Sequence, residues 1–115
     1  MNELVERLAT GDHPVTVGGP QPSLEEFRKR VTDIHYVFIK FIDTRGGTDL
    51  GVHIDTNATN LSQADFEQGV GVIHIEGTLT LNYIKVRCIA EINLSTLHGT
   101  GFLRACLGTA QGAKI

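Results

Sequence analysis

Length, composition and charge limit the classes of protein to which this chain can belong. Its 115 residues are enough for one globular domain, and 41% hydrophobic with 20% charged residues excludes wholesale disorder. A formal net charge of -3 at pH 7 supplies no positive field for phosphate backbones, so we expect no nucleic-acid partner. The first residues lack a signal-peptide core and no apolar run is long enough to cross a bilayer, which predicts a cytoplasmic protein without a membrane partner.

Residues 1–22 are predicted to form an N-terminal segment outside the main domain. Apolar residues within 1–10 fall on one side of a short helix. Residues 11–22 (GDHPVTVGGPQP) hold all three prolines of the chain and three of its glycines, a composition typical of an irregular linker. We therefore expect the folded domain to begin after this linker.

A single α+β domain is predicted over residues 23–107. The sequence S-L-E-E at its start is a capping box, in which the hydroxyl of Ser23 and the carboxylate of Glu26 satisfy the first backbone N–H groups of a helix. The apolar stripe that follows predicts one amphipathic helix over about 23–33, covering the sheet formed by the rest of the domain. Residues 108–115, which are rich in glycine and alanine, are predicted to form a flexible tail.

The first two strands of the domain are predicted to form a hairpin. Residues 35–43 are β-branched or aromatic on both faces, as in a strand that is covered on both sides. Residues 44–47 (TRGG) supply a turn, and residues 49–55 then alternate strictly between apolar and polar side chains. One face of this second strand should therefore face the core and the other a polar environment.

The second half of the domain completes a set of about five antiparallel strands. A short helical turn is predicted near residues 62–68, and residues 70–94 are divided into two strands with bends at Gly77 and Asn82. Residues 102–107 are short and apolar, as expected for a last strand at the edge of the sheet. The predicted fold is a curled antiparallel sheet or half-open barrel covered by one helix.

Two of the predicted strands carry the same motif, a histidine two residues before a carboxylate. GVHIDT contains His53 and Asp55, and VIHIEGT contains His74 and Glu76. Because side chains alternate along a strand, the two members of each pair share a face. If the strands are antiparallel neighbours with His53 opposite Glu76, then His74 falls opposite Asp55 and each imidazole faces a carboxylate.

These four residues allow three interpretations. Two cross-strand pairs on the solvated face of a sheet need no ligand, and we favour this interpretation because half-exposed sheets commonly carry such pairs. The same side chains are also a ligand set for a divalent transition metal such as zinc, manganese or iron. Finally, they would form a metal-free acid–base or ligand-binding cavity if the sheet curled so that this face turned inward.

His98 is a further candidate because it opens the sequence HGTG. A histidine before a glycine-rich turn is similar to the oxyanion loop of esterases. The nucleophile motif G-x-S-x-G is missing from the sequence, so we favour a plain turn here. Cys88 and Cys106 stand in apolar strands without the spacing of a zinc or redox motif, which predicts reduced thiols in the core.

The function predicted from these observations is that of a small cytoplasmic binding or regulatory module without a cofactor. It would act through a sheet surface or an oligomer interface, holding a second copy of itself, another protein or a small ligand. The main support is a single small domain without a recognised catalytic motif and with a predicted edge strand. The alternative is a small enzyme, or a metal- or ligand-binding protein, that uses the cluster of His53, Asp55, His74 and Glu76.

Overall fold

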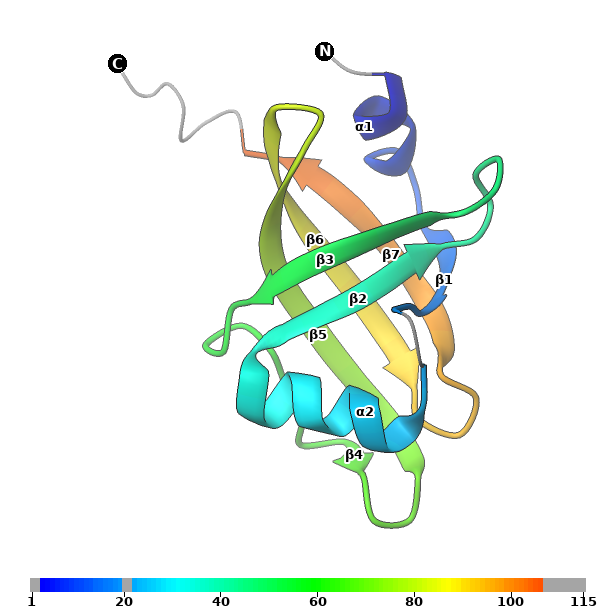
Figure 1. Ribbon diagram of the computed structural model, residues 1–115, viewed down its shortest axis with the longest axis vertical. Coiled ribbons are helices and arrows are strands. Elements are labelled where there is room, and N and C mark those ends of the chain that lie inside the picture. Colours follow the sequence, from blue (N-terminus) through cyan, green and yellow to red (C-terminus); the bar gives the residue numbers. More distant parts are fainter. Residues whose placement is uncertain (1–2, 20–21, 107–115) are drawn as a thin grey trace.

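The computed structural model describes residues 3–19 and 22–106 of the chain. Their helices and strands follow one another in the order shown in Figure 1. The elements are α1 (Glu3–Leu8), β1 (His13–Val17), α2 (Leu24–Lys29), the π-helical turn η1 (Arg30–Ile34), β2 (Tyr36–Phe41), β3 (Thr48–Ile54), β4 (Ala64–Asp65), β5 (Val70–Leu81), β6 (Ile84–Asn93) and β7 (His98–Ala105). The predicted flexible tail, 108–115, lies outside the described residues.

The molecule is a closed antiparallel barrel, which corrects the predicted half-open arrangement. Its strands are hydrogen-bonded in the order β3-β2-β1-β7-β6-β5, and β3 also pairs with β5, so the wall has six strands and no gap. The short strand β4 is attached beside β5. The sheet closes where Ile54 is opposite Gly77. A Cβ at Gly77 would collide with the backbone carbonyl of His53, so the absence of a side chain there allows the two strands to approach.

The predicted irregular linker contains a barrel strand. In β1 the side chains of His13, Val15 and Val17 are buried, while Pro14 is exposed. This strand joins β2 on one side and β7 on the other. The buried and exposed side chains of this segment alternate with a period of two, but its proline and glycines are typical of a loop, so the sequence did not indicate a strand. The neighbouring strands β2 and β7 supply the hydrogen bonds that stabilise it.

The predicted last strand is part of the closed wall. β7 has β6 along one side, and over its first four residues, His98–Gly101, it has β1 along the other. Residues 102–105, the described part of the predicted last strand, pair with β6 alone, so this end of β7 is a sheet edge as predicted, whereas 98–101 are paired on both sides. The short helical turn predicted near 62–68 is wrong, since this segment forms β4 between turns. Backbone N–H groups there donate to the side chains of Asn60 and Asp65, which favours turns over helix.

Three local predictions are confirmed. The side chain of Ser23 accepts a hydrogen bond from the backbone N–H of Glu26, so α2 begins at the predicted capping box. η1 continues α2 and ends at His35, whose left-handed backbone (φ 61°) places its N–H on the carbonyl of Arg30. β2 and β3 form the predicted hairpin, and Asn82 lies in the turn that joins β5 to β6.

Apolar side chains fill the barrel and both of its ends. The inward residues of the six wall strands belong to one hydrophobic cluster, and many of them are fully buried. Val5 and Leu8 of α1 close one end, and Phe27 and Val31 of α2 and η1 close the other; the two helices lie at opposite ends in Figure 1. Cys88 belongs to this core, where burial raises the pKa of its thiol to about 12. Because the interior is occupied by side chains, the surface available for chemistry is the outer wall.

Candidate functional site

The two His-x-acid motifs lie on neighbouring strands, but in a register different from the one considered above. His53 is opposite Thr78, two residues beyond Glu76. Asp55 is therefore beside Glu76, and its backbone N–H donates to the Glu76 carbonyl at 2.8 Å. A shift of two residues leaves every side chain on the same face but gives each one a new partner. The four candidate residues consequently divide into one group of three and the separate His53.

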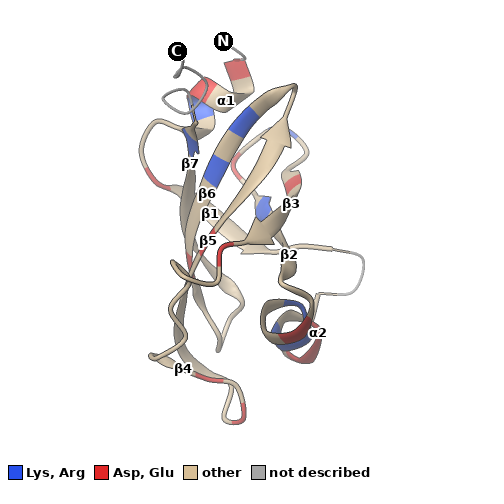
Figure 2. Ribbon diagram, turned by 90° about the vertical axis from the view of Figure 1, so that its left-hand side faces the viewer, with Lys and Arg blue, Asp and Glu red and all other residues tan. Residues whose placement is uncertain are grey.

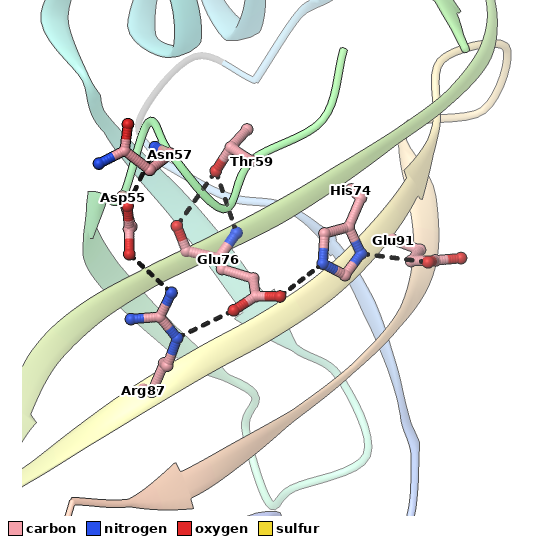
Figure 3. A network of polar contacts seen from close by, with 7 residues as sticks. All are labelled: Asp55, Asn57, Thr59, His74, Glu76, Arg87 and Glu91. Atoms are coloured by element: carbon pink, nitrogen blue, oxygen red, sulfur yellow. Dashed lines mark hydrogen bonds and ion pairs between the residues drawn. The ribbon is translucent and has the colours of Figure 1, made fainter. Parts of the chain in front are cut away.

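Arg87, which the sequence did not single out, joins the two carboxylates (Figure 3). It lies on β6 opposite Thr78, and its Nε donates to Glu76 Oε1 at 2.9 Å while its Nη2 donates to Asp55 Oδ2 at 2.8 Å. The guanidinium lowers the pKa of Asp55, and the two carboxylates raise the pKa of Arg87. One planar cation thus links β3, β5 and β6 by two charge-assisted hydrogen bonds.

His74 extends this network to a third carboxylate. Its Nε2 is 2.8 Å from Glu76 Oε2, and its Nδ1 is 3.1 Å from Glu91 Oε2 on β6. Both ring nitrogens face carboxylate oxygens, an arrangement that favours the doubly protonated imidazolium, in which each nitrogen donates a hydrogen bond. Hydrogen bonds first to Glu76 and then to Glu91 raise the pKa of His74, while the hydrogen bond to His74 contributes most to lowering the pKa of Glu76.

The segment that follows β3 is also fastened to this part of β5. The hydroxyl of Thr59 donates to the Glu76 carbonyl and accepts from the Glu76 N–H, both at 3.2 Å. Asn60 and His74 exchange two backbone hydrogen bonds, and the N–H of Asn57 donates to Asp55 Oδ1 at 3.0 Å. The chain after β3 therefore runs along β5 and brings Asp55 to Arg87.

We call Asp55, His74, Glu76, Arg87 and Glu91 the Arg87 network. With His74 protonated, its two cations and three carboxylates leave a net charge of -1, and the ring has no lone pair with which to accept a proton or bind a metal. Among the residues that the structure describes, no group of three or more His, Cys, Asp or Glu side chains is arranged to hold a metal ion. The chemistry that this arrangement supports directly is cross-linking of the barrel wall.

His53 lies outside the Arg87 network, in a pocket on the outer wall. Its ring packs against Tyr36 with centroids 4.8 Å apart. The pocket has a volume of about 340 Å³ and spans the seam between β3 and β5. We call it the His53 pocket; its lining residues are Tyr36, Gly51, His53, Thr78, Leu79, Thr80 and Lys85.

The composition of the His53 pocket differs from that of the Arg87 network. Its lining contains an ammonium group, an imidazole and three hydroxyl groups but no carboxylate. No ion pair of the described residues involves Lys85. Sequence analysis missed all of these residues except His53. They come from four strands, and only the cross-strand register brings them together.

His98 and the HGTG sequence are placed differently from the prediction. His98 is the first residue of β7, and the preceding turn ends at Leu97, so both glycines of HGTG lie in a strand. The backbone N–H of His98 donates to the hydroxyl of Thr96 at 3.2 Å. No hydrogen bond joins its ring to another described residue. Gly99 is required because a Cβ there would collide with the carbonyl of Glu91.

His13 forms a polar contact that the sequence did not indicate. Its Nδ1 is 2.7 Å from Asp43 Oδ2, and its Nε2 is 2.9 Å from the Arg7 carbonyl and 3.0 Å from that of Thr10. Acceptors on both sides again favour the imidazolium, and the hydrogen bond to Asp43 is the main reason that the pKa of His13 is raised. The contact fastens α1 to the barrel. Asp43 is thirty positions away in the sequence, so spacing gave no signal of it.

Comparisons with known proteins add no family to this geometry. No protein-family model matches the chain, and no curated protein matches it. Among the described residues, no helix is long and apolar enough to cross a membrane. Inferences about function therefore depend on the geometry of the chain itself.

Proposed function

We propose that the chain is a small binding module that holds a small ligand on the outer wall of its barrel, in the His53 pocket. The observation that carries this proposal is a concave surface of about 340 Å³ lined by hydrogen-bond donors that have no partner within the described residues. This volume is within the range of small-molecule sites. Donors that converge on a concavity without intramolecular partners can orient a ligand by exchanging their hydrogen bonds to water for bonds to it.

The filled interior supports a site on the outside of the barrel. Barrels that carry ligands internally leave a cavity between their strands, whereas here Val37, Ile39, Val52, Ile75 and Ile92 are fully buried within the wall. Some stretches of the wall are paired on one side only, namely residues 48–52 of β3 and 102–105 of β7. Association with a second copy or with another protein, which the sequence also predicted, would use these edges or side-chain surfaces.

The enzyme alternative has less geometric support. It requires His53, Asp55, His74 and Glu76 to converge, but the register pairs His53 with Thr78 and leaves the other three within the Arg87 network. Both carboxylates accept hydrogen bonds from cations, and the pKa values of both are lowered, which makes each a weaker base. We therefore propose a binding function without a catalytic step, in a protein that we expect to be cytoplasmic.

The test is a titration of isotope-labelled protein with a collection of small aromatic compounds that includes anionic, neutral and cationic members. We expect the backbone amide signals that shift to cluster on β2, β3, β5 and β6 around the His53 pocket. The shifts should be lost in His53→Ala and retained in His98→Ala, a control that removes an exposed histidine far from the pocket in the sheet. Shifts confined to another surface, or no shifts with any member, would contradict the proposal.

A further inference from the structure

We infer that the His53 pocket selects a small aromatic anion, meaning a planar ring that carries a phosphate or carboxylate group. This inference rests on the proposed binding function and adds the chemical class of the ligand. It follows from the fact that the pocket has an aromatic side and a cationic, hydroxyl-rich side. The two sides meet at the seam where His53 on β3 is opposite Thr78 on β5.

The aromatic side is a row of three rings on the outer wall. Tyr36 and Phe38 on β2 have centroids 5.5 Å apart, and His53 follows at 4.8 Å from Tyr36. The guanidinium of Arg30 lies 4.8 Å above the ring of Phe38, which secures the far end of the row. The end at the pocket is His53, which is exposed. A planar ligand ring can therefore pack against it and against Tyr36, which lines the same pocket.

Gly51 allows this row to form. A Cβ at this position would overlap the hydroxyl end of Tyr36, so the ring of Tyr36 lies directly over the backbone of β3. The backbone φ of Gly51 is not in the left-handed region that favours glycine. An alanine would therefore be tolerated by the backbone and would displace the ring of Tyr36, whose hydroxyl and Cζ lie nearest the new Cβ. This position separates the aromatic contribution from the charge of the pocket.

The opposite side of the pocket presents donors to an anion. Thr80 is opposite Lys85 in the β5–β6 hairpin, so an ammonium and a hydroxyl group stand side by side, with Thr78 two residues along the same face. The next cation on β6, Arg87, is already hydrogen-bonded to Asp55 and Glu76. Figure 2 shows that the basic residues of β6 lie in the half of the strand nearest this hairpin turn. Lys85 is therefore the cation left to bind a ligand.

The overall charge favours a small ligand over a long polyanion. A chain with a net charge of -3 repels an extended phosphate backbone, whereas one ammonium group and two hydroxyl groups in a concavity satisfy a single anionic group. The pocket thus matches a compound with one ring and one anion.

The experiment compares three probes on the full chain by calorimetry, with the binding position read from amide shifts. The probes are phenyl phosphate, inorganic phosphate, which lacks the ring, and benzyl alcohol, which lacks the anion. We expect phenyl phosphate to bind at least about tenfold more tightly than either of the other two. Lys85→Ala should weaken phenyl phosphate by about tenfold, whereas Lys29→Ala, which removes an exposed lysine of α2, should leave its affinity unchanged.

Gly51→Ala tests the aromatic side independently. It should reduce the affinity for phenyl phosphate to nearly that for inorganic phosphate while leaving inorganic phosphate unaffected, since no charge is changed. Benzyl alcohol binding as tightly as phenyl phosphate in the pocket would overturn the ligand class and leave the binding site intact. If none of the three probes binds but another compound of the wider collection binds in the pocket, the ligand class is likewise overturned and the binding site is retained. Failure of every compound would overturn the proposed function itself.

Discussion

The two histidines of the repeated motif, His53 and His74, differ in everything except their sequence context. Both lie on the outer face of the barrel, each two residues before a carboxylate. His74 is held between Glu76 and Glu91 with both ring nitrogens engaged. His53 instead contacts Tyr36 and borders a pocket without a carboxylate. The same motif thus belongs to a cross-link on β5 and borders an open pocket on β3.

The difference shows that the partners opposite a strand decide the chemistry of its side chains. Glu91 and Arg87 on β6 give the second motif its imidazolium and its neutralised carboxylates. Opposite His53 stand Tyr36 on one side and Thr78 on the other, neither of which has a carboxylate. A charged and internally satisfied region stabilises the fold, whereas a region of unsatisfied donors is available to a ligand.

The largest expected effect comes from the register that separates the two histidines. Gly77→Ala should destabilise the protein by about 2 to 4 kcal/mol, because the new Cβ meets the backbone of His53 where the barrel closes. Gly51→Ala should change the free energy of unfolding by only about 0.5 kcal/mol, because it meets the end of the Tyr36 side chain. Urea denaturation measures both. Equal effects of the two substitutions would mean that β3 does not approach β5 as described.

The next comparison uses two cations on the same face of β6. Arg87→Ala should destabilise the protein by about 1 to 2 kcal/mol, because it removes two charged hydrogen bonds and leaves Asp55 without a cation and Glu76 with His74 alone. Lys85→Ala should stay within about 0.5 kcal/mol of the wild type. Denaturant midpoints at low ionic strength provide the measurement. A Lys85 variant as unstable as the Arg87 variant would place both cations in structural roles and weaken the comparison.

The smallest expected effect is a pH dependence specific to His74. Its pKa is raised above 6.5, so its contribution to stability is fully present below the unfolded pKa and is lost as pH rises through the folded pKa. The stability difference between wild type and His74→Ala should therefore be about 1 kcal/mol near about pH 6 and fall toward zero by about pH 9. His13 titrates in the same direction, but it is present in both proteins and cancels in the difference.

The sequence predicted those parts of the fold whose signals are local. The capping box at Ser23 and the alternation of residues 49–55 each depend on neighbours within a few positions, and the helix and hairpin they predict are present. β1 was missed because Pro14 and the glycines around it outweighed a short alternation. Closure of the barrel was missed because it depends on the absence of one side chain, at Gly77, opposite a strand more than twenty residues earlier.

The candidate site could be predicted only as a set of side chains and not as an arrangement. His74 and Glu76 are in contact because they are two residues apart on one strand. Arg87 and Glu91 enter through the β5–β6 pairing, and the lining of the His53 pocket enters through three pairings at once. The period of two fixes which face a residue occupies, but it gives no information about register, and register determined both sites.

The most direct test of the account follows the ring nitrogen and carbon signals of all histidines by NMR while phenyl phosphate is added. The account predicts that the His53 ring signals move with the ligand, while those of His74 stay those of an imidazolium with two protonated nitrogens. Movement of the His74 signals with those of His53 unchanged would contradict it, because the Arg87 network would then be the binding site and the His53 pocket a passive surface.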